Sequence, residues 1–502
     1  MPRLLLGEEL AAPTLSERYL SRLCRRSFLR LWSWPHIYRN QTWSGGSEGK
    51  EVCDLLVVFD NHVFIFSDKY CAFPNSGDVA TDWSRWFKRA ILKSAKQLWA
   101  AERWIRDHPD RLFLDSACTQ SLPIPLPPVD QAVFHRIAVA HGSGPACQAL
   151  LGGSGSLMLA PDIVGTDHFN HQAPNFLPFS IGRLSTSKGY VHVVDDFTLD
   201  TVLSTIDTAA DLARYFQQKE QLILSGKLGM AAGEEELLAN YLRNTDDEGQ
   251  HCFQFPKSFT KVSVDEGFWD RFCKHPDRLA QIEADRVSYA WDELIDEFTK
   301  HALAGTQYFT TDASVGAHEK ALRLMAREPR TQRRMLSRWL LSVLKRADTE
   351  EWSVRAVLPI SPSGPHYLFL AVIPREDKTA DEYRVFRRNL LQSYCMVTRL
   401  KFPEARHVVG IATEPWSCGE TRSEDLIYLD GTRWTDAFAA EATTLQQELG
   451  LLKEVREFEM TEPEYPLSRD QSIGKGRNRN KSCPCGSGKK FKRCHGSQTQ
   501  GA

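Results

Sequence analysis

No apolar run in the 502-residue sequence approaches the roughly 20 residues that a bilayer-spanning helix needs. In the opening stretch, MPRLLLGEELAAP, a short apolar patch is followed directly by acids. This pattern fits neither a signal peptide nor a transit peptide. Of the twelve cysteines, nine are scattered singly and only the last three cluster. Scattered cysteines usually pack as small hydrophobes in a reducing compartment. We therefore expect a cytoplasmic protein without a membrane partner.

Several motifs of common enzyme classes are also missing. The phosphate-binding pattern Gly-x-x-x-x-Gly-Lys-Ser/Thr does not occur, because SGGSEGKE has Ser44 in place of the first glycine and Glu51 after the lysine. The glycine-rich stretch GGSGS lacks the third glycine of a dinucleotide fingerprint, where Met158 stands. No Ser-His-Asp or Cys-His constellation is recognisable either. The chemistry must be sought in other patterns.

The net charge of −2 conceals an uneven distribution. Residues 475–493 carry eight Lys or Arg and no acid, which leaves 54 bases against 64 acids in the remainder. The body is therefore formally about −10 and the tail +8. A basic tail of this kind either seeks a polyanion or is simply solvated.

The periodicities predict an α/β multidomain protein. A helix that starts at Thr14, two strands within residues 54–69, a helix over 82–106 and a strand over 133–141 form one α/β unit in residues 1–145. A mixed α/β to helical middle domain follows in 146–349, and strands and helices return as a second α/β unit in 350–460. Residues 461–481 lack apolar periodicity and are expected to form a basic flexible linker.

The segment SCPCGSGKKFKRCHG brings four metal-ligating side chains together near the end of the chain. Cys483 and Cys485 are one residue apart, and Cys494 and His495 follow after eight more residues. Zinc prefers four tetrahedral ligands of this kind, and two close pairs joined by a Gly-rich turn can provide them in a segment too small for a core. We predict a structural Zn²⁺ knuckle in residues 482–497.

This segment closely resembles the SEC-C motif, a zinc knuckle found at the ends of many unrelated bacterial proteins. The resemblance implies that the four residues bind zinc and that the knuckle is an attachment module for partner proteins or ribosomes. It covers only about fifteen residues, so it indicates how the protein is attached and leaves its chemistry open.

The stretch DLLVVFDNHVFIFSDK predicts a hairpin with charges at its ends. If Asp60 and Asn61 form a two-residue turn, Asp54 lies opposite Ser67. Alternate residues share a face of a sheet, so Asp54, Ser67 and Lys69 point to one side and Asp68 to the other. An acid and a lysine would then meet on one face at the end of a buried hairpin.

Together with its flanking helices and the following strand, this hairpin resembles the PD-(D/E)XK nucleases, particularly their NERD and Mrr-like branches. The resemblance implies a restriction-endonuclease-like N-terminal domain. In that family Asp is followed thirteen residues later by Glu-x-Lys; Asp54 and Lys69 match, but Ser67 stands in place of Glu. The resemblance implies that Asp54 holds Mg²⁺ or Mn²⁺, that Lys69 orients or activates water, and that Glu17 is an additional helix acid. Glu17 is explained equally well as part of a capping box with Thr14.

The missing carboxylate weakens such a metal site, because Mg²⁺ requires hard oxygen ligands. A β-bulge near Ser67 would bring Asp68 to the same face as Asp54. Glu51 is another substitute, although a regular strand points it away. On the following helix Arg89, Lys93 and Gln97 recur every four residues, which fits either phosphate contacts or a solvated stripe.

Two weaker signals remain. Asp167, His168 and His171 lie close together in the sequence, as metal ligands do, but solvated loop residues are the more common case. Residues 320–346 carry nine bases and one acid, which suits either a phosphate-binding surface or a core helix with a charged outer face.

The sequence thus indicates a metal-dependent nuclease that hydrolyses nucleic-acid phosphodiesters, with Asp68 or Glu51 completing the metal ligands of Asp54. Analogy with nucleases that carry accessory domains points to defence against foreign DNA. The alternative is an adaptor without catalysis: a degenerate nuclease fold that binds nucleic acid or protein and is tethered by the knuckle to a ribosome or protein partner.

Overall fold

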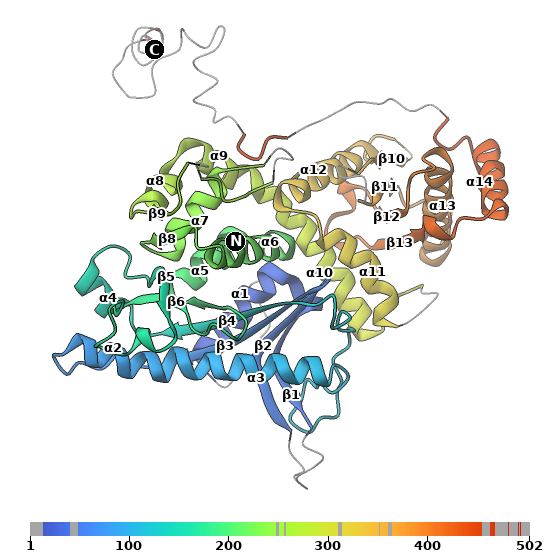
Figure 1. The fold of residues 1–502 in the computed structure, drawn as a ribbon. Coiled ribbons are helices and arrows are strands. Elements are labelled where there is room, and N and C mark those ends of the chain that lie inside the picture. Colours follow the sequence, from blue (N-terminus) through green and yellow to red (C-terminus); the bar gives the residue numbers. More distant parts are fainter. Residues whose placement is uncertain are drawn as a thin grey trace.

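A computed structural model describes residues 14–40, 49–246, 250–255, 258–309, 314–350, 352–359, 364–453 and 462–466, with residues 480, 490 and 492, and omits the side chains of residues 420 and 421. Its described part is a mixed α/β structure with one five-stranded and two four-stranded sheets. Figure 1 shows the yellow helices within residues 289–347 between the N-terminal sheet and the C-terminal one.

The five-stranded sheet has the order β1-β2-β3-β4-β7. Strands β1 to β3 are antiparallel neighbours, whereas β4 and β7 run parallel to β3. The bounds are β1 (Ser33–Arg39), β2 (Lys50–Phe59), β3 (His62–Tyr70), β4 (Val133–His141) and β7 (Val191–Val194). The predicted hairpin register is confirmed, since Phe59 pairs with His62 and Leu55 with Phe66. The register follows from the two-residue turn, in which Asp60 has a φ of 55°.

Helices cover both faces of this sheet. Helix α1 (Leu15–Trp32) starts with the predicted capping box of Thr14 and Glu17, and its Phe28 ring packs on Phe64 at 4.9 Å. The other face carries one long helix in three parts, α2 (Val79–Phe87), a π-helical turn (Lys88–Leu92) and α3 (Lys93–Asp107). The helix expected over 82–106 is therefore present, with an extra residue wound into it by the π turn.

The middle of the chain combines a small sheet with a helical region. The sheet has the order β6-β5-β8-β9. Its strands are β5 (Met158–Val164), β6 (Ser180–Arg183), β8 (Leu228–Ala231) and β9 (Val262–Val264). The helices are α4 (Gly144–Leu151), α5 (Asp196–Thr205), α6 (Ala209–Leu224), α7 (Glu234–Arg243), α8 (Phe268–Lys274), α9 (Pro276–Asp285), α10 (Tyr289–Ala304), α11 (Val315–Ala326) and α12 (Arg330–Ala347), with short 3-10 turns at Gly165–His168 and Arg286–Ser288.

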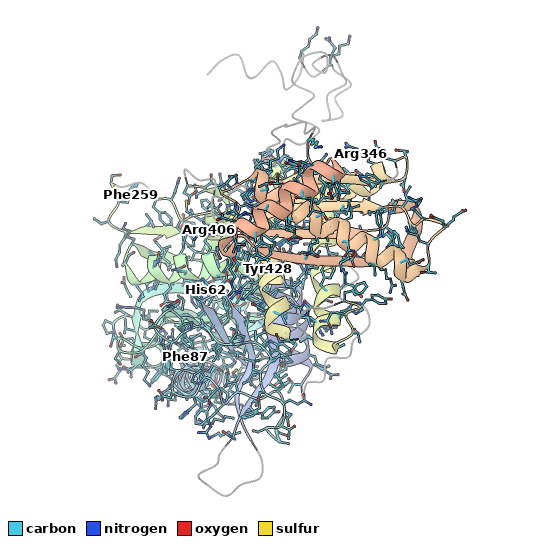
Figure 2. The ribbon with its side chains drawn as sticks, turned by 90° about the vertical axis from the view of Figure 1, so that its right-hand side faces the viewer. His62, Phe87, Phe259, Arg346, Arg406 and Tyr428 are labelled. Carbon is cyan, nitrogen blue, oxygen red and sulfur yellow. The ribbon has the colours of Figure 1, made fainter. Side chains whose placement is uncertain are left out.

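The second α/β unit is a four-stranded sheet with the order β10-β11-β12-β13. Its elements are β10 (Trp352–Val357), β11 (His366–Val372), α13 (Ala380–Lys401), β12 (His407–Thr413), β13 (Glu424–Asp430) and α14 (Asp436–Leu449), with 3-10 turns at Trp416–Thr421 and Gly431–Arg433. Figure 2 shows Arg406 and Tyr428 in this unit and Phe87 toward the opposite end of the molecule.

Strands β1 and β10 were not expected from the sequence, and β7 was expected only as a strand of the middle domain. Strand β1 contains Pro35 and His36, and the latter has a φ of 52°, so neither propensity nor periodicity marks it. Strand β10 is short and half-exposed. Strand β7 lies beyond residue 145 yet completes the first sheet, so a boundary at residue 145 does not follow the sheet.

Residues 462–466, which lie within the segment 461–481 expected to be a flexible linker, contact the folded body. Glu462 forms an ion pair with buried Arg334, with 2.8 Å between Oε2 and Nε, and the Tyr465 hydroxyl donates to the Leu242 carbonyl at 2.6 Å. Burial alone would raise the pKa of Glu464. Its hydrogen bond with His251 and the positive charge of that imidazole lower the pKa to about 2. These contacts anchor the segment on the helical region.

Among the described residues, no helix is both long and apolar enough to cross a membrane. The largest hydrophobic core extends from α1 and the first sheet through α5 and α6 to α10 and α12.

Candidate functional site

Asp54 lies on β2 at the open end of the hairpin, opposite Ser67. Its Oδ2 accepts a hydrogen bond of 2.5 Å from the backbone N–H of Asp68. The pKa of Asp54 is raised to about 6: burial raises it most, the Asp68 hydrogen bond and the Lys69 charge oppose this, and the charge of Glu51 adds to it. A carboxylate in this environment lacks full compensation for its charge.

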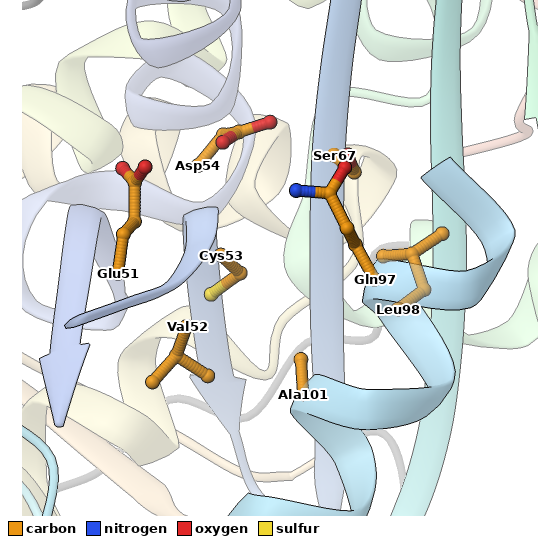
Figure 3. Close-up of a pocket in the computed structure, with 8 residues that line it drawn as sticks. All are labelled: Glu51, Val52, Cys53, Asp54, Ser67, Gln97, Leu98 and Ala101. Atoms are coloured by element: carbon orange, nitrogen blue, oxygen red, sulfur yellow. The ribbon is translucent and has the colours of Figure 1, made fainter. Parts of the chain in front are cut away.

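A β-bulge in β2 decides which face Glu51 occupies. Ile37 pairs with Cys53, but Tyr38 pairs with Glu51, so Val52 is an extra residue in β2. The bulge reverses the alternation, and Glu51 lies on the same face as Asp54. Both residues line one small pocket, and Figure 3 shows their carboxylates directed to the same side. The bulge thus lies beside Glu51, and not beside Ser67 as we considered from the sequence.

His36 and Glu17 extend this acidic group from two other elements. His36 Nδ1 lies 3.0 Å from Glu51 Oε1. That hydrogen bond raises the pKa of His36 against the opposing effect of burial, with the charges of Glu51, Glu17 and Asp54 adding to it. Glu17 closes the capping box of α1, and its charge also raises the pKa of Asp54. Sequence reasoning missed His36, because β1 itself carries no strand signal.

Ser67, Lys69 and Gln97 complete the surroundings. Ser67 is buried and lines the pocket with Gln97 of α3. The charge of half-buried Lys69 lowers the pKa of Asp54. In the stripe predicted on the helix, Arg89 lies in the π turn, and Lys93 and Gln97 lie in α3. All three are exposed, and Gln97 lines the pocket (Figure 3).

The structure does not bring Asp68 to this group. Its side chain is on the other face of the sheet, where its Oδ1 lies 2.6 Å from Nε2 of His141. The second nitrogen of His141 lies 2.5 Å from Asp196 Oδ1 on α5. Strand β3 pairs regularly with β4 from His62 to Tyr70, so no bulge turns Asp68 round. Asp68 is therefore not a partner of Asp54 in a common ligand set.

The donor set fits a hard divalent cation. Glu51 and Asp54 offer carboxylate oxygens on one face, which Mg²⁺ and Mn²⁺ prefer. The raised pKa of Asp54 indicates that a positive charge nearby would stabilise its ionised form. Lys69 provides one such charge and a donor for an anionic substrate.

His168 and His171 are not metal ligands in the arrangement observed. Buried His168 lies with its Nδ1 2.9 Å from the Gly165 carbonyl, and its Nε2 accepts from the Gly182 N–H at 2.9 Å. His171 Nε2 lies 2.7 Å from Ser84 Oγ. These residues tie a loop to its neighbours, so the expectation that they are solvated is wrong for His168.

The basic segment 320–346 is largely used inside the protein. Two of its arginines bind the hairpin turn at Asp60, and others pair with acids of the helical region. The paired bases are Arg323, Arg327, Arg330, Arg333, Arg334 and Arg338. The core-helix interpretation therefore holds for most of the segment.

The proposed zinc ligands Cys483, Cys485, Cys494 and His495 lie outside the described residues. Residues 479–497 match the SEC-C motif family, a zinc-binding module, so the predicted motif is confirmed. A segment of 104 residues is 38% identical to the protein translocase subunit SecA of Coxiella burnetii (strain RSA 493 / Nine Mile phase I). It covers 20% of this chain, and the chain spans only 10% of SecA. No solved structure matches the chain.

Proposed function

We propose that the chain is a metal-dependent nuclease whose site lies at the open end of the β2–β3 hairpin. The observation that carries the proposal is the bulge at Val52, which places Glu51 beside Asp54 on the face that also holds Ser67. The acid missing at Ser67 is thereby supplied from β2. The order of helix, strands, helix and strand around the pocket supports the resemblance to PD-(D/E)XK nucleases.

The residues divide the work as follows. Asp54 and Glu51 would hold a divalent cation, and His36 would fix the Glu51 carboxylate by the contact between its Nδ1 and Oε1. Such a cation, when bound, would supply Lewis-acid polarisation of the phosphodiester and a lowered pKa for the attacking water. Lys69 would orient that water or stabilise charge on the phosphate, and Gln97 would position either one from α3. By analogy with nucleases that carry accessory domains, the biological setting would be defence against foreign DNA.

The SEC-C motif supports a separate role in attachment. It is a zinc-binding module, and the resemblance to SecA includes this region. We propose that it tethers the folded body to a protein partner or a ribosome. The anchored segment 462–466 would transmit that tether to the helical region of the body.

The test compares the full-length protein with Lys69→Ala and Asp54→Asn on plasmid, linear and single-stranded DNA and on RNA, in Mn²⁺, Mg²⁺ or EDTA. Lys274→Ala is the matched control, because Lys274 is exposed and pairs only with Asp270 of its own helix among the residues described. We expect cleavage that needs metal, and a loss of about 10²–10⁴-fold in both site variants.

Cleavage that survives in both variants would exclude this site. Absence of cleavage on every substrate, together with salt-sensitive nucleic-acid binding that persists in EDTA, would instead identify an adaptor with a degenerate nuclease fold.

A further inference from the structure

Three histidines gather at the other end of the first sheet, on the face opposite the candidate nuclease site. They are His62 of β3, His135 of β4 and His192 of β7, and helix α6 covers them with Phe216. Figure 2 shows His62 in the middle of the molecule, between Phe87 and Tyr428. Residues 62 and 67 of β3 are about 17 Å apart along a strand of ordinary rise.

Two of these imidazoles are buried without the partners that such groups require. His135 is 1% exposed and His192 is 0% exposed. His135 Nδ1 and both ring nitrogens of His192 have no hydrogen-bond partner among the described residues. Buried polar atoms are nearly always paired, with protein, water or an ion, so three unpaired nitrogens in one cluster call for a ligand.

Glu220 of α6 brings a carboxylate to the same place. Its Oε2 lies 3.8 Å from His192 Nε2, and ligand atoms of His135, His192 and Glu220 all lie within 4.8 Å of one another. In a tetrahedral zinc site, ligand atoms are about 3.3 Å apart. Small side-chain rotations would close the difference. The Glu220 side chain is 25% exposed, which leaves an approach from solvent.

His62 is placed to orient one of the ligands. Its Nδ1 lies 2.9 Å from His135 Nε2. When His135 Nε2–H donates to His62, the lone pair of His135 Nδ1 remains for a metal, and such an outer partner is common behind metal-bound histidines. Burial lowers the pKa of His135 to about 3 and that of His192 well below its usual value, so both rings are neutral.

The nearby positive charges are already paired. Lys219 forms a buried ion pair with Glu234, and Arg136 forms one with Glu102. Glu220 therefore remains the carboxylate that faces the histidines.

We propose that His135, His192 and Glu220 form a second metal site, for a first-row divalent cation such as Zn²⁺, with His62 as the orienting residue. A site with two imidazoles and one carboxylate binds first-row cations such as Zn²⁺ in preference to Mg²⁺. The ion would join β4, β7 and α6. This site is independent of the proposed nuclease chemistry and of the SEC-C motif.

The visible absorption spectrum of bound Co²⁺ distinguishes the proposed histidine site from the SEC-C motif. The starting protein is the full chain with Cys483→Ser, Cys485→Ser and Cys494→Ser, which removes the thiolate ligands of the SEC-C motif and their charge-transfer band. On Co²⁺ addition we expect one tight equivalent with the strong visible bands of a four-coordinate ion. Adding His192→Phe or Glu220→Gln should abolish these bands, and His62→Phe should weaken Co²⁺ binding by about 10- to 100-fold. His301→Phe, an exposed position of α10, is the matched control.

Asp54→Asn should leave the bands unchanged, which separates this site from the candidate nuclease site. The proposal is overturned if the starting protein shows no such bands, or if His192→Phe and Glu220→Gln both retain them. Far-UV circular dichroism verifies the fold of each variant. If His192→Phe fails to fold, the half-buried Glu220→Gln decides alone.

Discussion

At the scale of single residues, the candidate site depends on where two acids point. Asp68 follows Ser67 in the sequence but faces His141, whereas Glu51 is distant from Ser67 in the sequence but lines the same pocket. The sequence identified Asp54, Lys69 and their common face, because strand alternation and a two-residue turn determine both. It could not show the orientation of Glu51, because the bulge arises from pairing with β1, which carries no signal of its own.

If Glu51 supplies the carboxylate that is missing at Ser67, then a glutamate at position 67 should rescue the cleavage activity of a Glu51 variant. Glu51→Gln should lower metal-dependent cleavage by about 10²–10⁴-fold, because one hard ligand is lost. Adding Ser67→Glu to this variant should raise the cleavage rate at least about tenfold, since the second carboxylate then returns to the pocket from β3. Initial rates on the preferred substrate provide the measurement. Glu51→Gln with Ser67→Gln is the control, and equal rates for the two double variants would contradict the exchange.

The charged state of His141 predicts a loss of stability in alkaline solution. Burial alone would lower its pKa, but the hydrogen bonds and charges of Asp196 and Asp68 raise it to about 9. A raised pKa means that the stabilisation is complete below the unfolded pKa of about 6.5 and is lost as the pH rises through about 9. We expect the free energy of unfolding to fall by about 1–3 kcal/mol between pH 6.5 and 9.5.

Urea unfolding across this pH range, compared with His141→Gln, measures the contribution of His141. The difference between the two proteins should shrink with rising pH. A constant difference would show that His141 is uncharged in the folded protein.

At the scale of elements, the basic pattern of residues 320–346 does not correspond to an exposed basic surface. The bases of α11 and α12 resemble a phosphate-binding stripe, yet their partners come from β-turn and helix residues far away in the chain. Arg333 and Asp292 each have side chains only 1% exposed. Such partners are invisible to local periodicity, whereas the helices themselves follow from it.

Asp292 should therefore be a strong stability determinant. Its two oxygens lie 2.6 Å from Arg333 Nη1 and 2.7 Å from Arg330 Nη1. Asp292→Ala leaves buried guanidinium charge without this partner and should cost about 3–5 kcal/mol in urea unfolding. The matched change Asp270→Ala removes an exposed pair with Lys274 and should cost about 0–0.5 kcal/mol. Similar costs for the two variants would refute this assignment.

At the scale of the whole molecule, residues 462–466 connect the C-terminal end of the described chain back to its middle. Glu462 and Glu464 meet Arg334 and His251, and Tyr465 bonds to the end of α7. The sequence suggested a basic flexible linker over 461–481, because this segment lacks apolar periodicity. Complementary charges on α12 and near α7, together with the Tyr465 hydrogen bond, hold the segment.

Two truncations test this anchor. A chain that ends at Pro466 should keep the melting temperature of the full protein and any cleavage rate it has, because the body and the candidate nuclease site are intact. A chain that ends at Thr461 loses charged hydrogen bonds to buried groups and should be less stable by about 1.5–3 kcal/mol. Thermal and urea unfolding of both chains provide the measurement. Identical stability would show that the contacts of residues 462–466 contribute nothing.

The late position of β7 also affects how the protein is made. The parallel edge of β4 ends at His141, but the strand that covers it ends at Val194. At a synthesis rate of about 5–20 residues per second, the ribosome needs about 3–10 s to add the intervening residues. During that interval an apolar, unpaired strand edge is exposed on the nascent chain. Growing chains of this protein should therefore require chaperone protection between β4 and β7, and slower translation of that interval should lower the yield of folded protein.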